Sequence, residues 1–243
     1  MIALIDGDIL VYRIGFAAQQ EVFGQLVPDP LPIVYHTMDK YIDMILDETT
    51  AATYSIFLSD PVNNYRKKFC KTIDYKGNRT PQGRPILYDT LREYLIKEYN
   101  AIVGKNVEAD DLLGIESQIL GPICLICSID KDLLMIPGRH YNFVKKEFVT
   151  INKQSGYKNF MKQLLMGDRV DNIPGIKGLG PKTAAKLVHK FQPHDGLLHD
   201  VIRRYKHCYN ISTLDALKLI QETGRLLWIQ QDEGVIWDLP ERY

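Results

Sequence analysis

The sequence predicts an α/β protein in which a mostly parallel central sheet, flanked by helices, is followed by a mainly helical part. Short apolar runs rich in β-branched and aromatic residues have the length of buried strands, and they lie at 1–5, 54–58 and 123–127. Segments with apolar residues at three- and four-residue spacing alternate with these runs and read as helices, at 36–48, 88–99 and 110–120. Strands that alternate with helices are typical of a parallel sheet.

Strand patterns fade beyond roughly residue 155. Three more helical patterns follow, separated by glycine and proline, at 157–166, 182–191 and 212–227. We therefore expect an α/β core over 1–155 and a helical part over 156–243.

The composition limits the possible partners and compartments. Thirty basic residues balance thirty acidic ones, so a nucleic-acid partner cannot be argued from net charge. The four cysteines are irregularly spaced, and no leader or bilayer-spanning apolar run is found, so we expect a reduced, cytoplasmic protein with no membrane partner. Cys124 and Cys127 have redox spacing, but their apolar surroundings favour small buried hydrophobes.

Aspartates follow each of the three predicted strands: Asp6 after the first, Asp60 after the second, and Asp130 with Asp132 after the third. Ligands of open α/β sheets bind beyond the carboxyl ends of the strands, so these side chains are expected to converge. Other acids are candidates for the same place, namely Glu108, Asp110, Asp111, Asp168 and Asp171. The first three open a predicted helix, where complementing the helix dipole is the alternative explanation.

Such a cluster of carboxylates needs neutralisation. Two carboxylates about 4 Å apart repel by roughly 4 kcal/mol at an effective dielectric near 20, so either some are protonated or divalent cations bind. Oxygen ligands without cysteine or spaced histidine suit Mg²⁺ or Mn²⁺ rather than Zn²⁺. Two such ions would activate a water and stabilise a leaving oxygen, which makes phosphodiester hydrolysis the leading chemistry.

Two basic segments could hold a nucleic-acid backbone. Residues 61–84 contain seven basic side chains, including Arg66 and Lys67, against one acid, although a solvated loop is the alternative. The second segment is glycine-rich, but Pro181 interrupts any nucleotide-binding loop, which excludes an ATPase. Its helix start could instead hold a phosphate without reading a base, using Lys177, Gly178, Gly180, Lys182, Thr183 and Lys186.

Taken together, these motifs resemble the flap endonuclease and 5′–3′ exonuclease family, most closely its short bacteriophage members. Seven matching pieces occur in the family's order: Leu4-Ile-Asp-Gly-Asp8, Leu58-Ser-Asp60, Tyr75-Lys-Gly-Asn-Arg79, Val107-Glu-Ala-Asp-Asp111, Ser128-Ile-Asp-Lys-Asp132, Gly167-Asp-Arg-Val-Asp-Asn172 and Gly178-Leu-Gly-Pro-Lys182. The resemblance implies a PIN-like 5′ nuclease fold, with a short basic arch at about 61–100 in the nuclease core.

The resemblance also implies roles for these residues. One metal site would be formed by Asp6, Asp60, Glu108, Asp110 and Asp111, and a second by Asp130, Asp132, Asp168 and Asp171. Lys76 and Arg79 match residues at the base of the arch that contact the scissile phosphate and act as catalytic helpers. The segment at about 167–190 matches a helix-two-turn-helix that grips the duplex and, in relatives, holds a monovalent cation, often K⁺.

The expected function is a two-metal-ion 5′–3′ exonuclease or structure-specific 5′-flap endonuclease. It would act as a monomer on duplex DNA with a 5′ end or flap, or on an RNA–DNA hybrid, in phage replication (primer removal) or DNA degradation. A viral protein of this kind would work in the host cytoplasm. Two alternatives remain open: a toxin-like PIN-domain single-strand ribonuclease, and a catalytically silent structure-specific DNA-binding protein.

Overall fold

The computed structural model describes residues 1–78, 83–191 and 196–241, and its chain forms two compact units. We call them the sheet unit (Met1–Asn64, Thr80–Leu133 and Gly138–Thr150) and the helical unit (Tyr65–Arg79, Leu134–Pro137 and Ile151–Tyr243). The change near residue 150 lies close to the expected division at 155. One segment differs from that division, because residues 65–79 belong to the helical unit.

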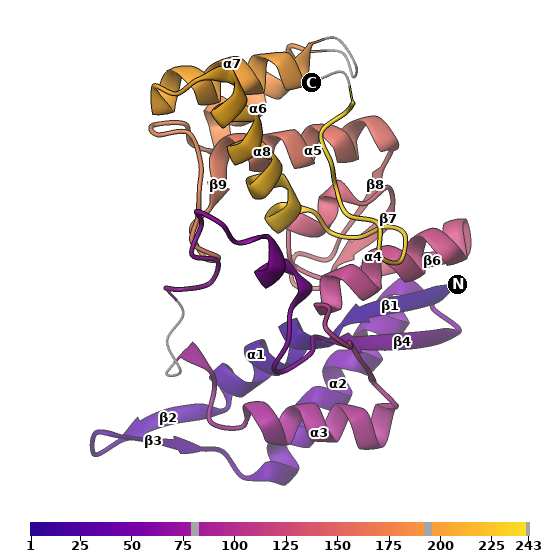
Figure 1. Cartoon of the computed structure of the whole chain (residues 1–243). Helices are drawn as coiled ribbons and strands as arrows, with labels where there is room; N and C mark the ends of the chain where they lie inside the picture. The colour runs from indigo at the N-terminus through magenta and orange to yellow at the C-terminus, as the bar shows by residue number, and fades with distance from the viewer. Residues whose placement is uncertain (79–82, 192–195, 242–243) are drawn as a thin grey trace. The chain divides into compact units, whose positions relative to one another are not determined.

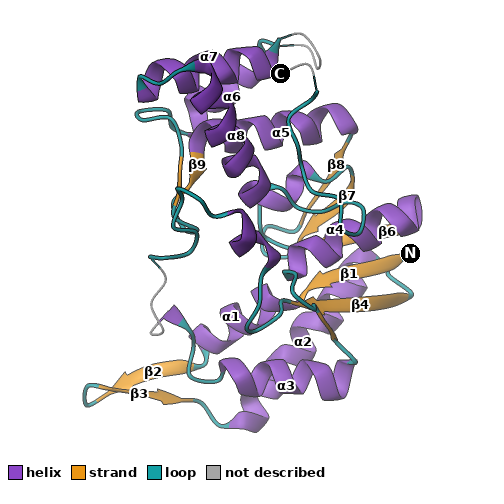
Figure 2. Cartoon of the chain, viewed as in Figure 1, coloured by secondary structure: helices purple, strands orange, loops and turns teal. Residues whose placement is uncertain are grey.

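The sheet unit is built on one sheet, which has six strands among the described residues, in the order β5-β4-β1-β6-β7-β8 (Figures 1 and 2). The predicted strands are confirmed as β1 (Ile2–Asp6), β4 (Thr53–Leu58) and β6 (Cys124–Cys127). The pairs β1–β4, β1–β6, β4–β5 and β6–β7 are parallel, which confirms the predicted fold class. The added strands are β5 (Ile102–Val103), β7 (Gly138–Asn142) and β8 (Glu147–Ile151).

Helices cover both faces of this sheet (Figure 1). Alternate strand residues such as Ala3 and Ile5 pack against α1 (Gly7–Ala17), α2 (Leu31–Thr49) and α3 (Tyr88–Tyr99) in one buried core. The residue between them, Leu4, is also fully buried. The helix α4 (Ala109–Leu120) contacts β1, β4 and β6. A hairpin of β2 (Gln19–Val22) and β3 (Gln25–Pro28) follows α1.

The two cysteines of β6 are core residues. Cys124 and Cys127 are 2% and 0% exposed, and burial raises the pKa of both thiols. A buried thiol with a raised pKa is a poor nucleophile, so their interpretation as small hydrophobes is confirmed.

The helical unit contains α5 (Lys153–Met166), α6 (Pro181–His189), α7 (Leu197–Tyr209) and α8 (Thr213–Leu227). Between α5 and α6 the short strands β9 (Gly167–Asp168) and β10 (Ile173–Pro174) pair antiparallel. A 3-10 helix, η1 (Tyr65–Phe69), comes from the other end of the sequence. Phe160 packs edge-on against Trp228 and Trp237, so both tryptophans belong to the packing of this unit. No helix among the described residues is long and apolar enough to cross a membrane.

Candidate active site

Strand register brings the predicted acids of the sheet unit to one edge of the sheet. Ile5 of β1 lies opposite both Ile56 of β4 and Cys127 of β6, and all three strands run the same way. Their carboxyl ends are therefore level. Asp6 is the last residue of β1, while Asp60 and Asp130 follow β4 and β6 within three residues.

Asp6 is a buried carboxyl, only 2% exposed. Its Oδ2 accepts a hydrogen bond from Ser128 Oγ at 2.7 Å, and its Oδ1 accepts one from Ile9 N at 3.1 Å. Burial, reinforced by the charges of Asp8 and Asp130, nevertheless raises the pKa of Asp6 to about 7. Near neutral pH the metal-free protein therefore holds a proton at this position in a large fraction of molecules.

The start of α4 adds the other members of the cluster. Burial raises the pKa of Asp110 well above its ordinary value, and the charges of Asp6, Asp130, Glu108 and Asp111 raise it further. Glu108 is the N-cap residue of α4, and its N–H donates to Asp111 Oδ2 at 3.2 Å. Glu108 therefore caps the helix and also belongs to the acidic site, so the two interpretations do not exclude each other.

Sequence reasoning did not find the cation that partners this cluster. Arg92, only 5% exposed, lies 2.8 Å from Asp8 Oδ1 and also donates to Ser59 O at 2.7 Å. The N–H of Ser59 donates to Asp8 Oδ2 at 3.1 Å. Burial raises the pKa of Asp8, while Ser59 and Arg92 oppose the rise. Nothing in the sequence signals the pair, because the two residues are 84 positions apart.

Asp60 has a different environment. Its pKa is lowered by hydrogen bonds from the N–H groups of Asn63, Val62 and Asn106, at 2.9, 2.8 and 2.6 Å. The carboxylate is ionised and organises two loops. Asp132, which follows Asp130, donates its own N–H to Asp130 Oδ1 at 2.8 Å.

We call the electrostatically coupled group the acidic cluster, consisting of Asp6, Asp8, Glu108, Asp110, Asp111 and Asp130. Within the part of the chain that the structure describes, no three His, Cys, Asp or Glu side chains already form a cage for an ion. Oxygen ligands alone still fit a hard divalent cation. Binding one would require some of these carboxylates to turn toward it.

The other predicted acids, Asp168 and Asp171, lie in the helical unit. Asp168 Oδ1 accepts from Val170 N at 2.8 Å in the turn between β9 and β10. Asp171 meets Lys76, since Lys76 N donates to Asp171 O at 2.8 Å and Lys76 Nζ lies 3.6 Å from Asp171 Oδ2. A predicted catalytic residue and a predicted metal ligand are therefore neighbours within one unit. Arg79 lies outside the described residues.

Two side-chain amides strengthen this contact between the segments around Lys76 and Asp171. Asn172 Nδ2 donates to Asp74 O at 2.7 Å, and Asn78 Nδ2 donates to Arg169 O at 2.9 Å. Lys76 itself has φ 59°, in the left-handed region. Contacts on both sides hold it in this uncommon backbone conformation.

The glycine-rich segment leads into α6 as expected. Gly178 has φ +79° and Gly180 is the N-cap of α6, with Pro181 in the first turn. The side chains predicted to bind nucleic acid here are exposed: Lys177, Lys182, Thr183 and Lys186. Exposed lysines beside a helix N-terminus suit a phosphate backbone, and the assignment stays a prediction.

The prediction for Arg66 needs correction, whereas that for neighbouring Lys67 does not. Lys67 is exposed, but Arg66 is 2% exposed. Its guanidinium donates to Leu226 O at 3.0 Å and to Trp228 O at 2.6 Å. Arg66 therefore ties η1 to the end of α8 and does not offer its charge to a ligand. The buried Tyr65 and Tyr75, likewise, present no free face for a base to stack on.

We expect Arg66→Met to destabilise the protein. Both carbonyls that the guanidinium satisfies would lose a donor, and each such loss costs roughly 1–3 kcal/mol in the free energy of unfolding. Urea unfolding of Arg66→Met and Lys67→Ala measures the difference. An unchanged Arg66→Met midpoint, or an equal loss in Lys67→Ala, would contradict the buried role.

Comparison with known proteins agrees with this architecture. Residues 1–163 match the model of the 5′–3′ exonuclease N-terminal resolvase-like domain, and residues 159–216 match that of the 5′–3′ exonuclease C-terminal SAM fold. The 5′–3′ exonuclease of Buchnera aphidicola subsp. Schizaphis graminum is 31% identical over 210 residues, covering 78% of this chain and 70% of the relative. The flap endonuclease Xni of Pseudoalteromonas translucida is 31% identical over 218 residues, covering 81% of each.

The fold is also similar to that of a solved protein. The T5 D15 protein, crystallised with metal ions, superposes with a TM-score of 0.64 at 17% identity, covering 95% of this chain and 89% of the other. The two family matches and the relatives define a nuclease, and its fold agrees with that of the solved protein. The chain belongs to the 5′–3′ exonuclease family, which confirms the resemblance seen in the sequence.

Proposed function

We propose that this nuclease depends on two divalent cations, Mg²⁺ or Mn²⁺, and hydrolyses duplex DNA or an RNA–DNA hybrid from a 5′ end or at a 5′ flap. The observation that carries the proposal is the acidic cluster, in which the half-buried Asp110 has a pKa raised by burial and by the charges of four other acids. Without cations this arrangement costs the folded protein free energy. Its presence in a nuclease indicates that cations are needed at this edge.

The chain's own residues supply binding and orientation. Ser128 and Arg92 fix the carboxylates of Asp6 and Asp8 through bonds of 2.7 and 2.8 Å. Ions held there would increase the acidity of an attacking water and stabilise the leaving oxygen. Lys76 would supply positive charge to the scissile phosphate, while the exposed lysines before and within α6 would hold the duplex backbone.

Structures of related fold support this choice of ligands. One has the T5 D15 flap endonuclease as a pseudo-enzyme–product complex with DNA and metal ions, at a TM-score of 0.64 and 17% identity. That Asp168 and Asp171 are ligands, that K⁺ binds near 175–183, that the protein is a monomer, and that it removes primers in phage replication all stay predictions.

The toxin-like ribonuclease and the silent DNA-binding protein remain as alternatives. The first would not need the segment at 173–188, which the structure builds as β10, a turn at Gly178 and α6. The second predicts missing acids, whereas all nine predicted carboxylates occur in the sequence.

One gel tests the proposal. The substrates are 5′-flap DNA, blunt duplex DNA, an RNA–DNA hybrid and single-stranded RNA, each labelled at its 5′ end and incubated with Mg²⁺ or EDTA. We expect Mg²⁺-dependent release of label from duplex substrates. Binding without cutting of any duplex would support the silent protein, and cutting of single-stranded RNA alone would support the ribonuclease.

A further inference from the structure

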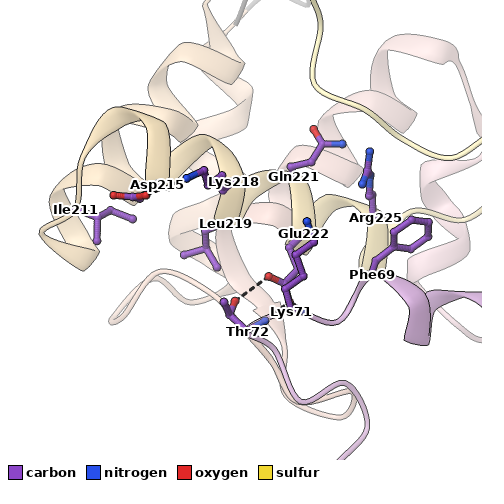
Figure 3. Close-up of a pocket in the computed structure, with 10 residues that line it drawn as sticks. All are labelled: Phe69, Lys71, Thr72, Ile211, Asp215, Lys218, Leu219, Gln221, Glu222 and Arg225. Atoms are coloured by element: carbon purple, nitrogen blue, oxygen red, sulfur yellow. Dashed lines mark hydrogen bonds and ion pairs between the residues drawn. The ribbon is translucent and has the colours of Figure 1, made fainter.

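Glu222 of α8 makes an unusual set of contacts with the segment that carries Lys76. Its Oε1 accepts from three successive backbone N–H groups, those of Lys71, Thr72 and Ile73, at 2.7, 2.7 and 2.9 Å. Its Oε2 accepts from Thr72 Oγ1 at 2.8 Å. Figure 3 shows the Glu222 side chain reaching from α8 to this segment. One carboxylate thus fixes the course of three consecutive residues.

The Glu222 side chain is ionised at this position. It is only 6% exposed, and burial acts to raise its pKa. The hydrogen bonds from Thr72, Ile73 and Lys71 outweigh burial and lower the pKa below its ordinary value. Successive N–H groups that point at one anion stabilise its charge. In turn, the carboxylate satisfies amides that have no place in a helix or strand.

A pocket of ≈ 430 Å³ lies between the segment and α8, lined by Phe69, Lys71 and Thr72 on one side and by residues of α8 on the other. Lys71 and Thr72 are themselves exposed. Buried anchors in the neighbourhood are Ile73 and Tyr75, 5% and 8% exposed. Glu222 bridges the segment to α8 beside this pocket.

Three residues beyond this bridge lies Lys76. Its backbone conformation, with φ 59°, is maintained by the bond from its N–H to Asp171 O. Because Asp74 is also bonded to Asn172, the chain from 71 to 78 is held at its beginning by Glu222 and at its end by the 169–172 turn. Glu222 and the 169–172 turn therefore fix the two ends of one short segment, with Lys76 between them.

We propose that Glu222 is a positioning residue, which fixes the backbone of 71–73 and thereby holds the Lys76 side chain beside Asp171. The role rests on the proposed function, in which Lys76 contacts the scissile phosphate. Glu222 touches neither substrate nor reacting atoms. Its effect on catalysis passes through Lys76.

A double-mutant cycle tests this coupling. Glu222→Ala is expected to lower kcat on 5′-flap duplex by about 10²-fold, the size of loss that misplacing a catalytic group produces, with KM nearly unchanged. If Glu222 acts through Lys76, the double variant Glu222→Ala/Lys76→Ala is no slower than Lys76→Ala alone. Losses that multiply, or a kcat for Glu222→Ala within about twofold of wild type, would overturn the proposal.

Glu222→Gln guards against a variant that does not fold. Its amide keeps one oxygen for the three N–H groups, and its NH₂ can donate to Thr72 Oγ1, so we expect a stable protein with a loss of about 10-fold or less in kcat that disappears in the Lys76→Ala background. Lys218→Ala is the matched control. Lys218 lines the same pocket from the same helix and pairs with Asp215 rather than with the segment.

Hydrogen exchange gives a readout that does not need cleavage. In Glu222→Gln the amide of Lys76, which donates to Asp171 O, is expected to exchange at least about 10-fold faster than in wild type, as are the amides of 71–73. If only the amides of 71–73 exchanged faster, Glu222 would fix the backbone of those residues without affecting Lys76, and the proposal would be overturned. A wild-type protein that cuts no substrate would instead contradict the proposed function, while the exchange result for Glu222 would still stand.

Discussion

Asp110→Asn is expected to abolish Mg²⁺-dependent cleavage, lowering kcat by about 10³-fold or more, because it removes a charged oxygen that the proposed function assigns to metal binding. The same substitution is expected to stabilise the metal-free protein at high pH. Asparagine is uncharged, like the protonated acid. Deprotonated Asp110, in contrast, is repelled by the charges of Asp6, Asp130, Glu108 and Asp111. The gain in free energy of unfolding grows by about 1.4 kcal/mol per pH unit between the ordinary pKa of Asp110, 3.8, and its raised pKa in the folded protein, and it is constant above that.

Thermal melts in EDTA at low and high pH, together with single-turnover cleavage in Mg²⁺, measure both effects. Glu93→Gln is the matched control, since it removes one carboxylate charge from an exposed pair with Lys97 on α3. Asp110→Asn that cleaves at the wild-type rate would remove Asp110 from the active site. Equal melting temperatures of wild type and Asp110→Asn at high pH would show that repulsion within the acidic cluster does not destabilise the folded protein.

The metal-free protein is expected to lose stability as the pH rises from about 4 to about 7. The pKa of Asp6 is about 7 in the folded protein against an ordinary value of 3.8, so between these values the folded state binds the additional proton. Stability from this group is complete below the unfolded pKa and is lost as the pH passes the folded pKa. The slope is about 1.4 kcal/mol per pH unit for each such carboxyl, and Asp110 adds to it in the same direction.

Excess Mg²⁺ should reverse this dependence, because a cation binds the deprotonated carboxylates and stabilises the folded state more as the pH increases. Ser128→Ala gives an internal check. Ser128 Oγ donates to Asp6, so its loss should raise the pKa of Asp6 further and move the transition to higher pH. A metal-free protein that becomes more stable over this range would contradict the assignment of the shift to Asp6.

Local pattern was sufficient to predict the elements that carry the acidic edge. β1, β4 and β6 are short apolar runs, and α3 begins and ends at the predicted residues Tyr88 and Tyr99. The helix α1 was not predicted, since Ile9, Leu10 and Val11 are consecutive apolar residues and give no helical period. Strands β7 and β8 also escaped prediction, because each mixes polar and apolar residues too briefly for a pattern.

The site was predictable only as a list of acids. That Asp60 is ionised and bonded by backbone amides, while the pKa values of Asp6 and Asp110 are raised, depends in part on neighbours distant in the sequence, such as Asn106 for Asp60 and Asp130 for the other two. The same is true of Arg66, which sits in a basic run but donates to carbonyls 160 and 162 residues away. Composition gives a residue's charge, whereas tertiary packing decides whether that charge faces solvent.

The membership of residues 65–79 in the helical unit also bears on how the protein is made. A ribosome synthesises this segment 151 to 162 residues before its partners, because Arg66 and Glu222 bond it to α8 and to the residues just after that helix. Tyr65, Ile73 and Tyr75 of this segment are buried in the folded protein. During synthesis the segment therefore emerges well before the helix that fixes it, and its apolar side chains are open to non-native contacts until the two meet.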